Sequence, residues 1–223
     1  MARVLITGAN RGIGLALAKT YCNSGDDVIA TARHPERATE LQETGARVVK
    51  LEVTDPHSVE ALGEALAGQP IDLLINNAGM GDRDGFQSLD FDTFETILAV
   101  NTIAPIRILR TLRPNLAAGS APMVANISSL LGSIEDAGGD MGITYRVSKA
   151  GLNMALRAAA PTLAADGITV LALHPGWVKT DMGGEAAPIS PTDSARGLKR
   201  VIAEAGPSPT LRFLDWQGKT LPW

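Results

Sequence analysis

Short runs of β-branched and other apolar residues alternate along this chain with longer segments of helical period, and this alternation limits the folds open to it. The runs, such as "RVLIT" and "IDLLIN", are nearly continuous in apolar residues, which is typical of strands covered on both faces. Strands are expected at 3–7, 27–31, 47–53, 71–76, 121–128, 167–173 and 210–215, and helices at 12–24, 56–67, 90–113, 144–165 and 191–204. Because strands separated by helices require right-handed crossovers, the sequence predicts an α/β fold: a doubly wound parallel sheet of about seven strands with helices on both faces.

The composition excludes several classes of protein. The 223 residues fit one domain, 1–223, and a formal net charge of −4 leaves no basic surplus to neutralise nucleic-acid phosphates. Cys22 is the only cysteine, so a disulfide within the chain is impossible and a reducing compartment is expected. No signal-peptide pattern opens the chain, and no apolar run approaches the roughly 20 residues that cross a bilayer. We therefore expect a soluble, cytoplasmic protein that acts on a small molecule, with neither a nucleic acid nor a membrane as partner.

A glycine-rich loop joins the first expected strand to the first expected helix. "RVLITGANRGIG" places Gly8, Gly12 and Gly14 at this junction. Glycine lets a backbone turn sharply and approach a pyrophosphate, whose charge is stabilised by a helix N-terminus. The glycines could instead serve only a tight turn, but the strand before and the helix after favour a dinucleotide site.

The residues after the second expected strand indicate which nicotinamide cofactor is used. NAD sites usually carry an acid there to hold the ribose 2′-hydroxyl, whereas Thr31 and Ala32 stand at this position and Arg33 follows. Arg11 lies inside the glycine loop. Either arginine alone could be a solvated surface charge. Together, with the acid missing, the two guanidinium groups favour a 2′-phosphate and therefore NADP(H).

Motifs now accumulate in a recognisable order along the whole chain. They are "TGANRGIG", "NNAG" at 76–79, Asn101, "ISS" at 127–129, "YRVSK" at 145–149 and "PGWVKT" at 175–180. This set resembles the short-chain dehydrogenase/reductase family. "SSLLGSIED", "HPGWVKTDMGG" and the ending "RFLDWQGKTLPW" are similar to its C-factor and carbonyl-reductase-like branch. The resemblance implies a Rossmann-type fold, a nicotinamide cofactor and carbonyl–alcohol redox chemistry.

Tyr145 and Lys149 stand one helical turn apart near the start of helix 144–165. Hydride transfer to a carbonyl leaves negative charge on oxygen, and the resemblance makes Tyr145 the acid that protonates it. A phenol ordinarily titrates near pH 10, and the Lys149 ammonium is expected to lower the pKa of Tyr145 by stabilising the phenolate. In the family, this lysine also holds the nicotinamide ribose. The pair could instead face water, but its stripe continues through Leu152 and Leu156, which predicts burial.

Two further catalytic positions follow from the resemblance. Ser129 is the expected hydrogen-bond donor to the substrate carbonyl; Ser128 is the alternative, and Gly132 favours Ser129 because the family pattern is Ser-x-x-Gly. Asn101 lies inside helix 90–113, where Pro105 lacks the N–H that would bond the Asn101 carbonyl. That carbonyl is then free to hold a water, which matches the family's proton relay through Lys149.

The resemblance also extends the cofactor site. "NNAG" is expected to support the adenosine half, and "PGWVKT" to frame the nicotinamide, with Thr180 bonding its carboxamide. Glu52 departs from the pattern, since many relatives have an aspartate there that contacts adenine. The expected cofactor residues are Gly8, Asn10, Arg11, Gly12, Ile13, Gly14, Arg33, Glu52, Val53, Asn76, Ala78, Gly79, Tyr145, Lys149, Pro175, Gly176, Val178 and Thr180.

The helix that carries Tyr145 is apolar on a second side as well. Its opposite stripe consists of small and apolar residues, Val147, Gly151, Met154 and Ala158. A helix that is apolar on two sides needs two partners, so we expect a homodimer or a homotetramer. No metal site is expected, because the three histidines are scattered along the sequence.

These patterns predict an NADPH-dependent oxidoreductase that reduces an aldehyde or ketone to an alcohol. One alternative is a nucleotide-binding signalling or regulatory protein, as some C-factor-like relatives are thought to be. A less favoured alternative is an epimerase or dehydratase on the same fold. Segment 179–191 is expected to border the substrate. Trp177, Met182 and Met141 are candidates to line that site, which favours apolar carbonyls.

Overall fold

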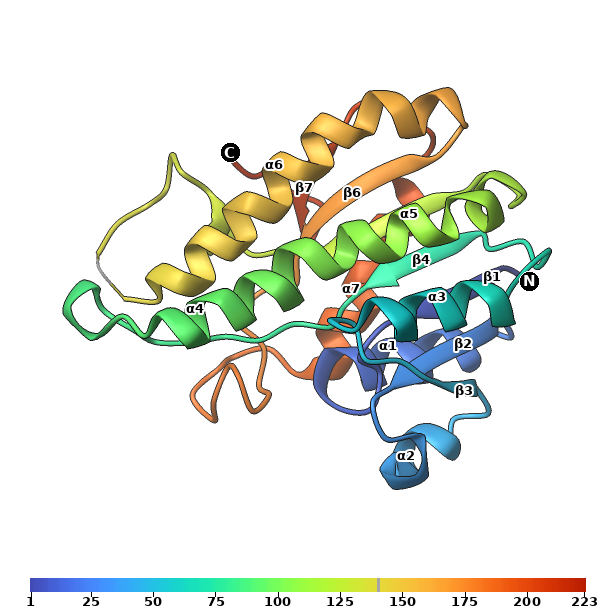
Figure 1. Cartoon of the computed structure of the whole chain (residues 1–223), viewed down its shortest axis with the longest axis horizontal. Helices are drawn as coiled ribbons and strands as arrows, with labels where there is room; N and C mark the ends of the chain where they lie inside the picture. Colours follow the sequence, from blue (N-terminus) through green and yellow to red (C-terminus); the bar gives the residue numbers. More distant parts are fainter. Residues whose placement is uncertain (140) are drawn as a thin grey trace.

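A single parallel sheet organises the computed structural model, which describes residues 1–139 and 141–223 (Figure 1). Within those residues, seven strands pair in the order β3-β2-β1-β4-β5-β6-β7, every pair parallel. The strands are β1 (Arg3–Ile6), β2 (Asp27–Ala32), β3 (Arg47–Lys50), β4 (Leu73–Asn76), β5 (Met123–Ile127), β6 (Thr169–His174) and β7 (Arg212–Asp215). The predicted doubly wound α/β fold is confirmed.

Helices cover both faces of the sheet. They are α1 (Gly12–Cys22), α2 (Thr39–Gln42), α3 (Pro56–Ala65), α4 (Phe91–Leu98), α5 (Ala104–Ala117), α6 (Ile143–Ala165) and α7 (Pro191–Glu204), with short 3₁₀ turns η1 (Pro35–Arg37), η2 (Phe86–Ser88) and η4 (Leu130–Gly132). One buried cluster joins the sheet to α3, α5 and α6, and a second joins its other face to α1, α2 and α7. β1 shows the alternation, since Leu5 enters the first cluster while Val4 and Ile6 enter the second.

The helix predicted over 90–113 is interrupted by one turn of π-helix, η3 (Ala99–Ile103), between α4 and α5. Pro105 has no N–H to continue the i to i−4 ladder, and the backbone widens so that Ala104 N–H reaches Ala99 O, five residues back. Asn101 stands at the centre of this turn. Such π turns are frequent at functional sites.

Two smaller differences also have physical causes. The strand predicted over 47–53 ends at Lys50, because β3 is an edge strand that pairs only with β2 and the pairing stops at Ala32↔Lys50. The short helix α2 has too few residues to show a helical period, and the sequence did not predict it.

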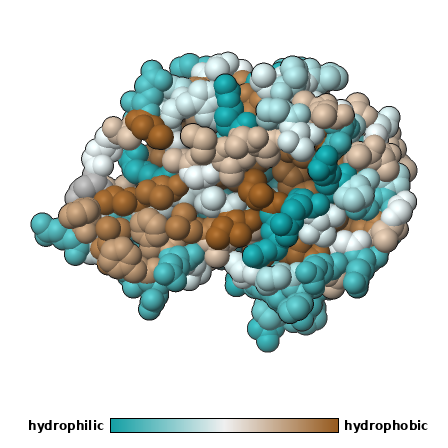
Figure 2. All heavy atoms as spheres, turned by 45° about the horizontal axis from the view of Figure 1, so that its top comes forward, coloured by the Kyte–Doolittle hydropathy of each residue, from teal (hydrophilic) through white to brown (hydrophobic). Residues whose placement is uncertain are grey.

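Hydrophobic side chains gather on one outer face, over the region where α4, η3 and the first half of α6 run (Figure 2). Phe91, Ile103, Val147 and Met154 are all exposed there, Met154 to 66%. In the described parts of the chain, no helix combines the length and apolar character needed to cross a bilayer.

Candidate active site

A groove of about 2120 Å³ runs along the carboxyl ends of β1, β2, β4, β5 and β6. Ligands of doubly wound sheets bind at this edge. Of the predicted catalytic and cofactor-binding residues, all except Asn76 and Asn101 line the groove. The fold therefore brings together a glycine loop, two arginines and the Tyr145–Lys149 pair, which lie up to 141 positions apart in the sequence (Gly8 to Lys149).

The glycine loop is packed backbone against backbone. Gly8 has a φ of +61°, and a Cβ built on it would lie 2.9 Å from the Cα of Ala78. A Cβ on Gly14 would lie 2.4 Å from the Gly8 carbonyl oxygen. Any side chain at either position would push the loop away from the end of β4, so these glycines set the floor of the groove.

The amide of Asn77, which the sequence reasoning passed over within "NNAG", holds this loop in place. Its Nδ2 donates to the carbonyl oxygens of Thr7 and Gly8, each at 2.9 Å. In return, Thr7 Oγ1 accepts the backbone N–H groups of Asn77 and Ala78 at 3.0 and 3.1 Å. The neighbouring Asn76 points elsewhere: it is buried in the sheet, donates to Asn126 Oδ1 at 2.9 Å and does not reach the groove.

The N-terminus of α1 faces the groove without a cap of its own. Arg11 occupies the N-cap position and makes no side-chain cap hydrogen bond, and the first turn carries no acidic residue. By contrast, α3, α4 and α7 are capped by Asp55, Asp90 and Ser190. The free N–H groups of α1 and the positive end of its dipole fit the pyrophosphate of a dinucleotide.

Apart from Asn76, the residues expected around the adenosine half line the groove, but two of them are already engaged. Arg11 Nη1 donates to Asp181 Oδ2 at 2.6 Å, across the groove from the glycine loop. Glu52 Oε1 accepts from Thr54 N and Oγ1 at 3.2 and 2.9 Å. Arg33 is exposed directly after β2 and makes no ion pair with any described residue.

Tyr145 and Lys149 meet at the end of β5, where their environment sets their protonation. Burial raises the pKa of Tyr145 to about 12, and a hydrogen bond with Ser129 acts in the opposite direction. Burial also lowers the pKa of Lys149 to about 8. The Lys149 ammonium donates to the Ile127 carbonyl at 2.8 Å and lies 5.7 Å from the Tyr145 ring centroid. The expected lowering of the Tyr145 pKa by Lys149 is therefore not seen, because burial of the phenol dominates.

The structure distinguishes the two candidate serines. Both serines line the groove, but only the Ser129 hydroxyl acts on Tyr145, whose pKa it lowers, and its Oγ accepts from Leu131 N at 3.1 Å. Ser128 Oγ instead donates to the buried Asn153 Oδ1 at 2.7 Å. Ser128 thus ties β5 to α6, while Ser129 is the serine beside the phenol.

Asn101 lies behind the groove wall and acts as a clamp. Its Oδ1 accepts from Met80 N at 2.8 Å, and its Nδ2 donates to Met80 O at 2.7 Å and to Ser148 Oγ at 3.0 Å. The side chain is fully buried. It therefore connects the segment after β4 to the helix that carries Tyr145.

The segment after β6 forms the remaining wall. Pro175, Gly176, Val178 and Thr180 line the groove as expected. Trp177 and Met182 also line it, whereas Met141, 63% exposed, does not. The Met182 side chain crosses the groove, since its Cγ lies 3.0 Å from the position of a Cβ on Gly81.

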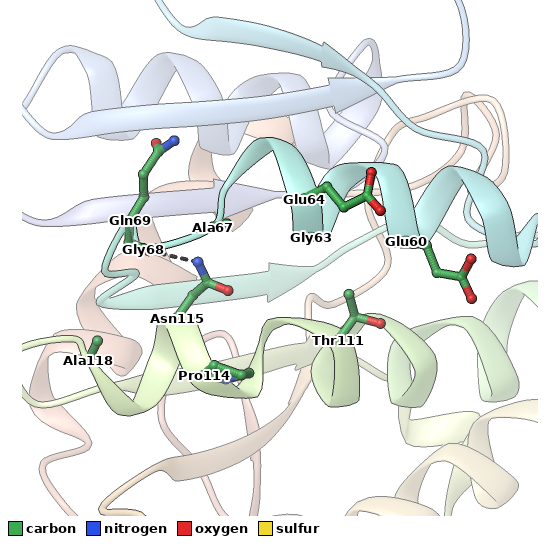
Figure 3. A pocket seen from close by; sticks show the side chains of 10 residues that line it. All are labelled: Glu60, Gly63, Glu64, Ala67, Gly68, Gln69, Thr111, Pro114, Asn115 and Ala118. Atoms are coloured by element: carbon green, nitrogen blue, oxygen red, sulfur yellow. Dashed lines mark hydrogen bonds between the residues drawn. The ribbon is translucent and has the colours of Figure 1, made fainter.

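A second hollow of about 530 Å³ lies between α3 and α5 (Figure 3). Asn115 closes its end by donating to the carbonyls of Leu66 and Gln69. Gln69 and Ala118 lie just before β4 and β5, so this hollow is at the amino ends of the strands, away from Tyr145. The groove at the carboxyl ends is the candidate active site.

The sheet is doubly wound, and a glycine loop leads from β1 to the uncapped N-terminus of α1. Ser129, Tyr145 and Lys149 lie near the end of β5. This combination is typical of a dinucleotide-binding oxidoreductase. Comparison with known proteins gives the family. The short chain dehydrogenase family matches residues 2–189. The chain is 39% identical over 155 residues to the C-signal of Myxococcus xanthus, covering 69% of this chain and 93% of that one.

Two further similarities cover the full length. The 1-hydroxy-2-glutathionyl-2-methyl-3-butene dehydrogenase of a Rhodococcus species is 34% identical over 230 residues, covering 100% of both chains. The crystal structure of NADPH-bound carbonyl reductase from chicken fatty liver superposes with a TM-score of 0.92 at 35% identity, covering 100% of this chain and 99% of that one. The chain belongs to the short-chain dehydrogenase/reductase family, as its sequence motifs predicted.

The buried Lys149 predicts a specific pH dependence of stability. Its pKa is about 8 in the folded protein and 10.5 ordinarily. Below pH 8 both states are protonated and the burial penalty is present in full. Between these pH values only the unfolded state keeps the proton, so stability rises with pH. We expect a rise of up to about 3 kcal/mol in the wild type that is absent in Lys149→Met.

Urea unfolding at several pH values between 7 and 10.5 measures this difference. Lys19→Met, which removes a half-exposed lysine of α1, is the matched control and should keep the wild-type rise. An equal rise in the Lys149→Met variant would contradict the burial of a titrating ammonium.

Proposed function

We propose that this protein is an NADPH-dependent reductase of aldehydes or ketones. The observation that carries the proposal is the grouping of Ser129, Tyr145 and Lys149 along one groove that fits a dinucleotide, with the Lys149 ammonium 5.7 Å from the Tyr145 ring centroid. When bound, the nicotinamide supplies the hydride. The chain's own residues polarise the carbonyl, provide the proton and keep both reactants in place.

Each group has a role that its environment supports. Ser129 and Tyr145 both line the groove, and we assign to their hydroxyls the two hydrogen bonds to the substrate carbonyl oxygen. The Tyr145 phenol is protonated at neutral pH, as any phenol with a pKa of 10 or above is, and this form can give a proton to a developing alkoxide. Lys149 lines the groove as well, and we assign to it the contact with the nicotinamide ribose. We assign proton resupply to water at the Asn101 carbonyl, whose helical partner position is Pro105.

The choice of NADPH rests on charge. The residue directly after β2 is Arg33 and not an acid, and Arg33 and Arg11 both line the groove, so two guanidinium groups are available to a 2′-phosphate. The structural relative from chicken fatty liver is NADPH-bound. Following NADPH and NADH oxidation with a panel of aldehydes, ketones, quinones and diketones tests both halves of the proposal.

The likeness to a protein named C-signal favours one alternative, a nucleotide-binding protein with a signalling role and little redox turnover. The two proposals differ in what the phenol is for. Binding alone does not require a protonated Tyr145 in contact with Ser129, whereas reduction does. NADPH binding without reduction of any carbonyl in the panel would favour the alternative.

Removal of the phenol oxygen separates catalysis from binding. Tyr145→Phe should lose turnover by about 10³-fold or more, because the alkoxide then lacks its acid, while NADPH affinity stays within a few-fold. Ser129→Ala should lower kcat by about 10²-fold, and Ser120→Ala, at an exposed position just before β5, is the control that should leave kcat unchanged. Steady-state kinetics and fluorescence titration of NADPH give both quantities, and full activity of Tyr145→Phe would refute the mechanism.

Arg33 is expected to select the cofactor. Arg33→Ala should weaken NADPH binding by about tenfold and leave NADH binding unchanged, because one charge-assisted contact to the 2′-phosphate is lost. Arg37→Ala, which removes an exposed arginine outside the groove, should change neither. A strong preference of the wild type for NADH would overturn the assignment.

We also propose that the apolar face over α4, η3 and α6 is covered by a second copy of the chain. Val147 and Met154, the larger residues of the predicted stripe, are 43% and 66% exposed, and Phe91 and Ile103 extend the face. Met154→Asp should shift a dimer or tetramer towards monomer in light scattering with size exclusion, because a carboxylate is then buried at the interface. Ala61→Asp on the exposed side of α3 should leave the mass unchanged. A monomeric wild type would contradict the proposal.

A further inference from the structure

The helix that carries Tyr145 begins without a cap of its own. The residue at the N-cap of α6 is Gly142, with a φ of 68°, so it has no side chain to accept a hydrogen bond. The first turn also contains no acidic residue. A helix leaves its first N–H groups without internal partners, and an uncapped first turn frays. Tyr145 is the third residue of α6, inside that turn.

Asp84 supplies the missing cap from a distant part of the chain. Thr144 N–H points at its carboxylate, 3.3 Å from Oδ1 and 3.4 Å from Oδ2, and Thr144 Oγ1 donates to Oδ2. The Asp84 carbonyl accepts from Gly142 N at 2.6 Å. Asp84 is 7% exposed and Thr144 fully buried, although 60 positions separate them. The positive end of the α6 dipole faces this buried carboxylate.

The segment that carries Asp84 is also a wall of the groove. Asn101 holds its start at Met80 through two hydrogen bonds, and Asp84 holds its end at the first turn of α6. Between these two anchors, Gly81 packs against Met182 from the opposite wall. The position of the wall and the position of the phenol are therefore set by the same contacts.

We propose that Asp84 is a positioning residue for the reaction: acting through Thr144, it fixes the start of α6 and thereby the distance of the Tyr145 hydroxyl from Ser129 and the substrate carbonyl. The inference rests on the proposed reductase function. Asp84 does not touch the reacting atoms. Its effect arises because a displacement of a reacting group by about 1 Å can lower a rate by about 10²-fold.

Four variants test this role. Asp84→Ala and Thr144→Val remove the acceptor and the donor, and both should lower kcat by about 10- to 100-fold while the Kd for NADPH stays within threefold. Thr144→Ser keeps the hydroxyl and should restore most of kcat. Asp84→Asn keeps one acceptor oxygen without the charge and should give an intermediate value. Asp55→Asn weakens the cap of α3, which packs on α5 and not on α6, and should leave kcat unchanged.

Hydrogen exchange gives a second readout that does not depend on activity. In Asp84→Ala, amides of the first turn of α6 should exchange about 10-fold faster, as expected for the loss of a cap, and those of β5 and β6 should be unaffected. The inference is overturned if Asp84→Ala and Thr144→Val keep full kcat. It is also overturned if kcat, NADPH affinity and Tm fall together and Thr144→Ser is no better than Thr144→Val. If the wild type reduces no carbonyl, the proposed function fails instead, and unchanged exchange at the start of α6 would by itself refute the cap.

Discussion

The amide of Asn77 is the contact on which the groove depends. It joins the end of β4 to the carbonyls of Thr7 and Gly8, while Thr7 Oγ1 returns two hydrogen bonds to the β4 side. Because Gly8 packs against Ala78 with no room for a Cβ, these bonds can form only when the glycine loop lies flat against the next strand. The uncapped N-terminus of α1 is thereby aimed into the groove. Without these hydrogen bonds, the anion-binding N-terminus of α1 would not be held in a fixed position relative to Tyr145.

The other half of the groove is built by the same kind of contact between distant segments. Lys149 donates to the Ile127 carbonyl, Ser128 donates to Asn153, and Gly132 packs on the backbone of Lys149. These contacts hold α6 against the end of β5, so that Ser129 and Tyr145 line the same groove. The segment after β4 links the two halves, because Asn77, Met80 and Asp84 lie along it and each is tied to a different element.

Local patterns were sufficient for much of this. Continuous apolar runs predicted the strands because a strand buried on both faces leaves little choice of residue type, and Pro105 predicted irregularity beside Asn101. Sequence spacing gave the wrong sign for the pKa of Tyr145. The four-residue interval to Lys149 suggested a lowered pKa, whereas burial of the phenol raises it. Within "NNAG", the sequence does not tell which asparagine faces the sheet. Pairing with Asn126 takes Asn76 into the core and leaves Asn77 for the glycine loop.

The sequence by itself determined the alternation of strands and helices, the glycine loop and the family motifs, because each of these depends only on residues that are close together along the chain. Only the tertiary structure decided that Ser128 bonds Asn153, that Arg11 pairs with Asp181, and that Asp84 caps α6. Those contacts join residues 25, 170 and 60 positions apart. A hydrogen bond requires atoms within about 3 Å. Residues so distant along the chain meet that condition only after the parallel sheet has brought the strand ends to one edge.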